Sequence, residues 1–297
     1  MRQAKVKTYA KINMVLNCLY KRDDGYHEIS SIMQAISLHD NINLKPAGEI
    51  ILNSNSTLIP LDEKNFAFKA AQLVISKYPS IKGVEIYIDK KIPIEAGLAG
   101  GSTNAAGVIL GMNKLFNLKM TTSEMIEVAE QIGSDVPFGI IGPTALSTGR
   151  GTNVSPIPEA PLLWVVLLKP DFGVSTPKVY SNMKEQMFEK TDNIKGFLGA
   201  LERKDQDYIL GNLVNTLEKS TFALYPKVQE IKDFFIRNTK HSLMAGSGPT
   251  VFALFPNEIE AINFKDSIPP DYGKAYLAQT IDSKEIHERV IIDEKEN

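Results

Sequence analysis

Residues 93–104 (P-I-E-A-G-L-A-G-G-S-T-N) have the composition of a phosphate-binding loop. Gly97, Gly100 and Gly101 fall close together, and glycine lets the backbone approach an anion closely. Residues 102–104 are Ser, Thr and Asn, which commonly cap helix N-termini. Because a helix start presents unpaired N–H groups and partial positive charge, we predict that this stretch binds phosphate. An ordinary glycine-rich turn between a strand and a helix is the alternative.

Two better-known phosphate-binding motifs do not fit this stretch. A Walker A loop requires Gly-Lys-Ser/Thr after its glycines, whereas Gly101 is followed directly by Ser102. The dinucleotide-binding fingerprint requires glycines spaced as GxGxxG, and the spacing here differs. A phosphate site at this position therefore depends on backbone N–H groups rather than on a loop lysine.

A second set of polar residues lies near the N-terminus. From Val6 to Tyr20 the even positions are mainly apolar, which predicts a long strand with one buried face. Lys11 and Asn13 both occupy odd positions, so they share the other face. A lone lysine on such a face is usually solvated, and this interpretation of Lys11 stays open beside a functional one.

Asp135 is a third candidate, within Ser134-Asp135-Val136-Pro137. Asp is a preferred N-cap residue, and Pro is favoured in the first helical turn. Residue chemistry alone therefore favours a capping role for Asp135.

Regular elements are expected on both sides of these candidates. Alternation predicts a strand over 83–88 before the glycine loop, and apolar spacing predicts a helix over 105–116 after it. A helix over 65–78 is expected to begin with Asn65 as its N-cap. Residues 246–248 (Gly-Ser-Gly) predict a tight turn between two strands.

The composition is that of a soluble globular protein, with 43% hydrophobic and 23% charged residues. The formal net charge of −2 gives no reason to expect a nucleic-acid partner. One cysteine, Cys18, excludes an internal disulfide and suits a reducing compartment. Apolar runs are too short to span a bilayer. We therefore expect a cytoplasmic protein without a membrane partner, and monomer and homodimer both stay open.

The proline-rich residues 156–161 predict a domain boundary. We expect an N-terminal domain over 1–157 and a C-terminal domain over 158–297. Helices and strands mix without strict alternation, which favours an α+β fold. Residues 172–180 are expected to form a loop, and the charged tail from Ser283 is expected to fray.

Three blocks of sequence together resemble a known enzyme family. The first is Lys11-Ile12-Asn13, followed by Asp24-Gly25-Tyr26-His27. The second is the glycine loop with Gly133-Ser134-Asp135-Val136-Pro137, and the third is Gly246-Ser247-Gly248-Pro249-Thr250. In this order and spacing they resemble the galactokinase, homoserine kinase, mevalonate kinase and phosphomevalonate kinase (GHMP) superfamily. The Asp-Gly-Tyr-His block resembles its 4-diphosphocytidyl-2-C-methyl-D-erythritol kinase family.

The resemblance implies a fold and a reaction. The implied fold has an N-terminal domain like domain 2 of ribosomal protein S5 and a ferredoxin-like C-terminal domain, with the site in the cleft between them. The implied reaction transfers the γ-phosphate of ATP to a hydroxyl of a cytidine diphosphate substrate. ATP, accompanied by Mg²⁺, is the implied phosphoryl donor, and no protein site dedicated to a metal is expected.

The resemblance also implies roles for particular residues. Asp135 would be the catalytic base, and Lys11 a catalytic lysine whose ammonium favours an ionised carboxylate. ATP would be bound by Asn65, Pro93, Ile94, Glu95, Ala96, Gly97, Leu98, Ala99, Gly100, Gly101, Ser102 and Thr103. The substrate would be bound by Asn13, Tyr26, His27, Thr176, Tyr180, Ser247 and Gly248. Tyr26 and Tyr180 would stack on cytosine, and His27 would read its edge.

Three other functions remain as alternatives. A kinase of the same superfamily acting on homoserine or a mevalonate would not need Tyr26 and His27. A non-catalytic ligand sensor on this fold could lose its base, but Lys11 and Asp135 are both present. An RNA-binding role, suggested by the ribosomal fold of the implied first domain, conflicts with the near-neutral charge.

Overall fold

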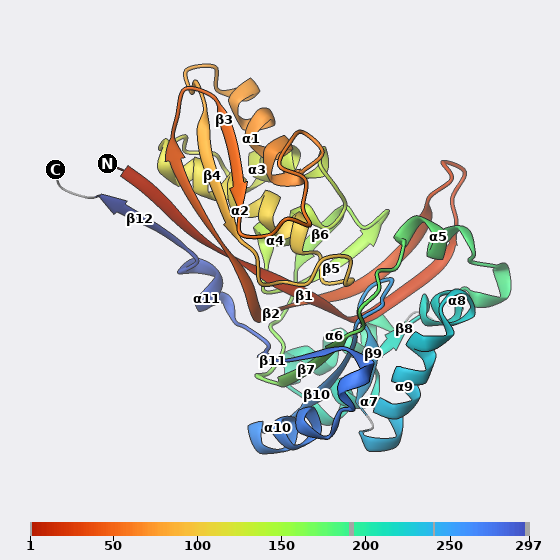
Figure 1. Ribbon diagram of the computed structural model, residues 1–297. Coiled ribbons are helices and arrows are strands. Elements are labelled where there is room, and N and C mark those ends of the chain that lie inside the picture. The colour runs from red at the N-terminus through yellow and green to blue at the C-terminus, as the bar shows by residue number, and fades with distance from the viewer. Residues whose placement is uncertain (1, 190–192, 240, 295–297) are drawn as a thin grey trace.

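A computed structural model describes residues 2–189, 193–239 and 241–294. Its longest elements are β1 (Arg2–Lys21) and β2 (His27–Pro46), which pair antiparallel along most of their length. Figure 1 shows this pair running across the whole molecule, with other elements above and below it. The predicted N-terminal strand is confirmed, and it connects both halves of the fold. The expectation of a single buried face is wrong, because residues 8–18 are buried on both faces between the two halves.

Eight of the described strands form the first sheet, with the central order β12-β1-β2-β4-β3. β5 pairs antiparallel with residues 29–34 of β2, and β6 pairs antiparallel with β5. The short β8 pairs parallel with β1. The remaining bounds are β3 (Ile50–Ser54), β4 (Val84–Asp89), β5 (Thr144–Gly149), β6 (Asn153–Pro156), β8 (Val214–Asn215) and β12 (Val290–Glu294).

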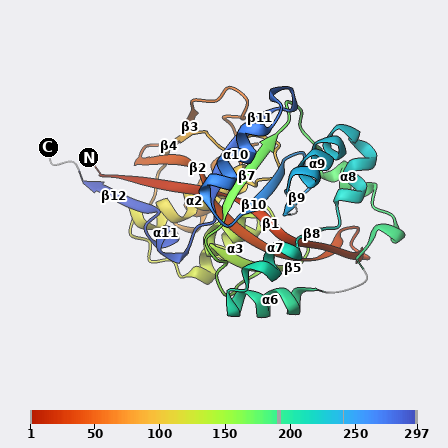
Figure 2. The ribbon, with the colours of Figure 1, turned by 90° about the horizontal axis from the view of Figure 1, so that it is seen from below.

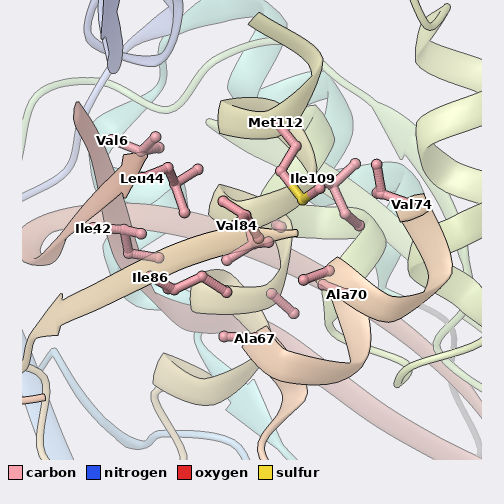
Figure 3. Close-up of a cluster of buried hydrophobic side chains, with 14 of the residues drawn as sticks. Val6, Ile42, Leu44, Ala67, Ala70, Val74, Val84, Ile86, Ile109 and Met112 are labelled. Atoms are coloured by element: carbon pink, nitrogen blue, oxygen red, sulfur yellow. The ribbon is translucent and has the colours of Figure 1, made fainter. Parts of the chain in front are cut away.

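Four helices pack against the first sheet: α1 (Phe66–Lys77), α2 (Gly100–Leu115), α3 (Thr122–Glu130) and α4 (Val136–Ile141). Their apolar residues meet those of β1, β2 and β4 in one buried cluster, part of which Figure 3 draws. A Cβ on Gly107 would lie 2.2 Å from the Thr8 methyl group, and one on Gly111 would lie 2.3 Å from Leu44. These glycines let α2 lie directly on the sheet.

The second sheet has the order β11-β7-β10-β9. One face packs against β1 and β2, and the other is covered by α9 and α10, which lie on the side away from β1 in Figure 1. Its strands are β7 (Trp164–Lys169), β9 (Ser242–Met244), β10 (Val251–Phe255) and β11 (Lys274–Gln279). The helices of this half are α5 (Thr176–Ser181), α6 (Ile194–Arg203), α7 (Gln206–Gly211), α8 (Glu218–Leu224), α9 (Pro226–Asn238) and α10 (Glu258–Ser267). The 3-10 turns are η1 (Glu185–Met187) and η2 (Pro270–Tyr272).

The charged C-terminal tail is ordered through residue 294, so the expectation of fraying from Ser283 is wrong for the described part. It forms α11 (Ser283–His287) and then β12, which pairs antiparallel with β1. The start of β1 and the end of β12 consequently lie side by side in both Figure 1 and Figure 2, with Arg2 paired to Glu294. Apolar contacts of Ile286 and Val290 anchor the segment. The tail thus returns across the proposed domain boundary near residue 157 to the first sheet.

Mixed helices and strands in two mainly antiparallel sheets confirm the α+β class. Two local expectations need correction. Residues 172–180 are not entirely loop, because α5 begins at Thr176. The helix after the glycine loop begins at Gly100 rather than at residue 105. Across the described ranges, no helix combines the length and apolarity that crossing a bilayer requires.

Candidate active site

A cavity of about 1020 Å³ is lined by residues of both halves of the molecule. It is large enough for two ligands of nucleotide size, since pockets for one small ligand usually measure about 300–1,000 Å³. The predicted site residues that line it are Lys11, Asn13, Tyr26, His27, Asn65, Pro93, Ile94, Glu95, Ala96, Gly97, Leu98, Ala99, Gly100, Gly101, Ser102, Asp135, Thr176, Tyr180 and Ser247.

Lys11 and Asp135 meet in this cavity although 124 positions separate them in the sequence. The Lys11 ammonium lies 3.5 Å from the Asp135 carboxylate. Lys11 is only 4% exposed, so the solvated interpretation of this lysine is wrong. The reason is tertiary: its backbone N–H donates to Leu98 of the glycine loop, and Gly246 of the second half lies against its ammonium.

A short relay orients the Lys11 ammonium. Lys11 Nζ donates to Asn13 Oδ1 at 2.8 Å, and Asn13 Nδ2 donates to Ser31 Oγ at 2.9 Å. Ser31 Oγ donates its single proton to the Val15 carbonyl at 2.7 Å. Because that proton is used, Ser31 accepts from Asn13, and the amide oxygen of Asn13 must face Lys11. The shared strand face was predictable, but the part played by Ser31 was not.

Asp135 occupies the N-cap position of α4, yet its side chain makes no capping hydrogen bond. The carboxylate instead faces Lys11 and is 38% exposed. Within the described residues, no hydrogen-bond donor occupies its oxygens. The capping interpretation is therefore wrong for the side chain, and the carboxylate is free to accept a proton from a ligand.

The glycine loop ends at the N-terminus of α2, as a phosphate-binding loop should. Ala99 is the N-cap, in a left-handed conformation with φ of 57° and without a side-chain cap. Residues 102–104 lie within the helix rather than capping it. The first N–H groups of α2 are therefore not satisfied by a capping side chain, and Gly101 exposes them beside the cavity.

The loop glycines have different reasons for being glycine. A Cβ on Gly97 would lie 2.1 Å from the Ala245 carbonyl oxygen, and Gly246 approaches the Gly97 carbonyl from the other side. The two glycine turns therefore touch backbone to backbone. A Cβ on Gly101 would meet nothing within 4 Å. Gly97 is required by packing, whereas Gly101 leaves open space beside the helix N-terminus.

A buried polar network supports the loop from below. Asp40 is fully buried and accepts from the backbone N–H groups of Lys91 and Ile92 at 2.6 and 2.7 Å. It also accepts from Lys90 Nζ at 2.5 Å and from Asn104 Nδ2 at 2.9 Å. These bonds connect β2, the segment before the loop, and α2. Burial lowers the pKa of Lys90, and the negative charge of Asp40 opposes this effect.

The opposite end of the cavity is aromatic. The rings of His27 and Tyr180 are 5.3 Å apart, and the Arg150 guanidinium lies 3.5 Å from the centre of the Tyr26 ring. Burial, with a smaller effect of Lys21, lowers the pKa of His27, so its imidazole is neutral at pH 7. Burial also raises the pKa of the Tyr180 hydroxyl. A neutral imidazole beside flat rings suits a polar aromatic ligand.

The remaining predicted residues divide into three groups. Thr176 and Ser247 lie at the cavity, where their hydroxyl oxygens are 2.7 Å apart. Asn65 caps α1 by accepting from Ala67, and its amide donates to Pro60, which leaves its second amide N–H available to a ligand. Thr103 and Gly248 do not line the cavity. The Thr103 hydroxyl donates to Gly100 within α2, and Gly248 lies against Met244.

Four basic residues that line the cavity were missed: Lys21, Lys64, Lys90 and Arg150. Lys90 follows strand β4 and precedes the loop, so a signal existed in its position next to a predicted anion site. Lys21 ends strand β1, and Lys64 and Arg150 belong to turns that the fold brings to the cavity. Among the described residues, the carboxylates that line the cavity are those of Glu95 and Asp135. In the part of the chain that is described, no three acidic, His or Cys side chains form a metal-binding group.

Comparison with known proteins agrees with this geometry. Residues 65–143 match the GHMP kinases N terminal domain, and residues 197–275 match the GHMP kinases C terminal domain. A protein of Brevibacillus brevis named 4-diphosphocytidyl-2-C-methyl-D-erythritol kinase is 44% identical over 85% of this chain and 88% of its own. A protein of the same name from Caldicellulosiruptor saccharolyticus is 42% identical over 94% of this chain and 97% of its own.

Solved structures give the same result. A crystal structure of 4-(cytidine 5'-diphospho)-2C-methyl-D-erythritol kinase superposes with a TM-score of 0.79 at 28% identity, covering 93% of this chain and 98% of that one. A homoserine kinase from Cytophaga hutchinsonii shares the fold, with a TM-score of 0.74 at 19% identity over 94% and 95% of the two chains. The GHMP kinase fold predicted from the motifs is confirmed, and the chain belongs to the 4-diphosphocytidyl-2-C-methyl-D-erythritol kinase family.

Proposed function

We propose that this chain transfers the γ-phosphoryl group of ATP to a hydroxyl of 4-diphosphocytidyl-2-C-methyl-D-erythritol, in isoprenoid precursor synthesis. The substrate O–H bond breaks, and its proton passes to Asp135. The hydroxyl oxygen bonds to the γ-phosphorus while the bond from that phosphorus to the β–γ bridging oxygen breaks, which releases ADP. The supporting observation is the 3.5 Å approach of Lys11 and Asp135 between the glycine loop and the His27–Tyr180 pair.

Lys11 stabilises charge in this scheme. An ammonium has three donors, and one of them is used by Asn13. The other two can contact Asp135 and a reacting oxygen. A fixed positive charge aimed at the transferring group stabilises the transition state without reorganising. We therefore assign Lys11 to charge stabilisation and Asp135 to proton acceptance.

The glycine loop is assigned to the phosphates of ATP. Its exposed backbone at Gly101 and the first turn of α2 offer N–H donors. Asn65 also lines the cavity, and its amide keeps one N–H beyond the bonds to Pro60 and Ala67. We propose that Asn65 and the segment around it contact the adenosine. Thr103 is left out of the assignment because its hydroxyl points into α2.

The aromatic end is assigned to the cytidine. His27 would read the base edge by hydrogen bonding, and Tyr26 and Tyr180 would offer ring faces. Thr176 and Ser247, whose hydroxyls already meet, would contact the substrate nearer the reacting centre. Gly248 is left out because it lies outside the cavity lining.

Mg²⁺ fits this site as an ion that arrives with ATP. Mg²⁺ usually keeps several waters and is held by one or two carboxylates plus substrate phosphates. Asp135 and Glu95 are the carboxylates available at the cavity. When bound, the ion would neutralise phosphate charge. The partners we propose are accordingly ATP and the cytidyl substrate, the proposed location is the cytoplasm, and monomer and homodimer both remain possible states.

A substrate panel tests the proposal. Purified protein is incubated with labelled ATP and the cytidyl substrate, its uridyl analogue, homoserine or mevalonate. Uracil replaces the exocyclic donor of cytosine by an acceptor and its ring acceptor by a donor. A site that reads these groups should therefore lower kcat/KM for the uridyl analogue at least 100-fold, roughly 3 kcal/mol.

Two histidine variants sharpen the panel. His27→Ala should weaken the cytidyl substrate and shrink its advantage over the uridyl analogue. His39→Ala is the matched control, because His39 bonds to the Ser37 carbonyl away from the cavity. Equal use of both nucleotides, or transfer to homoserine or mevalonate instead, would favour another kinase of the superfamily.

A further inference from the structure

Arg289 is a buried cation in the C-terminal tail, away from the cavity. It is 9% exposed, and its guanidinium donates to the carbonyls of Gly139 and Ile140 at 2.7 Å each. These carbonyls belong to the last turn of α4, where carbonyl groups have no partner inside the helix. Arg289 thus holds the end of the helix that Asp135 begins.

The charge of Arg289 is directed at this helix end. Across the described ranges, no carboxylate forms an ion pair with it. Burial lowers its pKa to about 10, so it stays charged at neutral pH. A cation at a helix C-terminus interacts favourably with the carbonyl groups there. The bidentate guanidinium fixes both carbonyls in one geometry, as a lysine could not.

α4 is also fixed on a second side. A Cβ on Gly139 would lie 2.6 Å from the Cβ of Ala106, so α4 packs directly on α2. α2 begins at the glycine loop. At the end of α4, Ile286 of the tail packs against Gly142. The short helix is therefore clamped between the helix of the phosphate loop and the C-terminal tail.

We propose that Arg289 is a positioning residue for Asp135. By holding the C-terminal end of α4, it sets where the helix lies along α2 and hence where the carboxylate stands relative to Lys11 and the phosphate loop. A shift of about 1 Å at a reacting group can lower a rate about 100-fold. The inference rests on the proposed role of Asp135 as the base.

A double-mutant cycle tests this inference. Arg289→Met and Arg289→Lys are made in the wild-type protein and in Asp135→Asn, and single-turnover transfer of labelled phosphate is measured. Arg289→Met should lower the rate roughly 10- to 100-fold with KM for ATP unchanged. Arg289→Lys, which keeps the charge, should recover part of the loss. In Asp135→Asn neither change should lower the residual rate further, because residues that act together are not additive.

Lys232→Met is the matched control. Lys232 is a buried cation that donates to the Ser242 carbonyl and pairs with Glu218 in the second half of the molecule. Any loss it causes should be the same in both backgrounds. An equal loss from Arg289→Met in both backgrounds would make Arg289 merely structural and overturn the inference. If Arg289→Met does not fold, the same cycle with Arg289→Lys decides. Near-native turnover of Asp135→Asn alone would instead remove the proposed base.

Discussion

Two lysine–aspartate pairs of the described residues each contain a buried lysine, but one carboxylate is buried and the other is open to the cavity. In the pair of Lys90 and Asp40 the charged atoms are 2.5 Å apart, and the side chains are 6% and 0% exposed. In the pair of Lys11 and Asp135 they are 3.5 Å apart, and Asp135 is 38% exposed. The Asp40 carboxylate accepts hydrogen bonds from two chain segments, residues 90–92 and Asn104 of α2, whereas Asp135 keeps its oxygens open to the cavity.

The difference teaches how a structural ion pair can be told from one poised for chemistry. A buried carboxylate whose oxygens are all engaged by the protein has no capacity left for a ligand. Removing it leaves a buried ammonium unpaired, so the loss appears in folding. Lys11 is as buried as Lys90, but its carboxylate is partly exposed, lies 3.5 Å away and accepts no backbone N–H bond. Losing Asp135 should therefore reduce stability less than losing Asp40 and reduce turnover far more. The two loop glycines differ in the same way: Gly97 is packed against the protein, whereas Gly101 faces open space.

The largest expected effect on turnover comes from the pair of Lys11 and Asp135, whose carboxylate is open to the cavity. Asp135→Asn removes the proton acceptor but keeps the shape, so kcat should fall by roughly 10²- to 10⁴-fold. ATP binding and the melting temperature should stay near the wild-type values. Steady-state kinetics, ATP titration and thermal unfolding measure the three quantities. Near-native turnover in the folded variant would show that Asp135 is not the proton acceptor.

For the buried pair of Lys90 and Asp40, a substitution should reduce stability rather than turnover. Asp40→Asn leaves the Lys90 ammonium without its counter-ion, and the free energy of unfolding should fall by roughly 3 kcal/mol. The kcat of the folded protein at saturating ATP should change much less. Asp89→Asn is the control, because its pair with Lys91 is partly exposed and should contribute less than about 1 kcal/mol. Chemical denaturation checks both; similar losses would erase the distinction between the pairs.

Gly101 and Gly97 of the glycine loop allow the same comparison of a site open to ligand with one packed in the protein, with smaller expected effects. Gly101→Ala places a methyl group in open space, so stability should be kept while KM for ATP rises roughly tenfold, or about 1.4 kcal/mol. Gly97→Ala forces a methyl group against the Ala245 carbonyl at a φ of 75°, so it should destabilise the fold. Unfolding curves and ATP kinetics separate the two. A Gly101→Ala enzyme with unchanged KM would mean that ATP does not approach this backbone.

The smallest expected effect is a pH dependence from His27. Burial and, to a smaller extent, Lys21 lower the pKa of His27 from its usual 6.5, so the neutral imidazole predominates at pH 7. KM for the cytidyl substrate should be flat above pH 6.5 and rise a few-fold toward pH 5.5, because protonation removes the acceptor nitrogen. The same group destabilises the fold only as the pH falls below 6.5, since the unfolded chain then binds the proton more readily. A rise in KM beginning above pH 7 would point to another group.

Local patterns and motifs were enough to predict much of this protein. Alternation placed Lys11 and Asn13 on one face of a strand, and the glycine cluster marked a helix start next to the cavity. The Thr121–Glu124 capping box forms as its spacing predicts. The three motif blocks were specific enough to identify the family. These features depend on neighbouring residues, and neighbours are what a sequence reports directly.

Only the tertiary structure decided which of these residues are buried by other parts of the chain and which face the cavity. Strand periodicity shows that Lys11 and Asn13 share a face, but not that the turn at Gly246 buries it. The bond of Asp40 to Lys90 joins residues 50 positions apart, so neither residue alone predicts it. The charged tail seemed free to fray, because the contacts that order Arg289 come from α4, far away in the chain. Burial and pairing belong to the packed chain, so the sequence could name the chemical groups but not their partners.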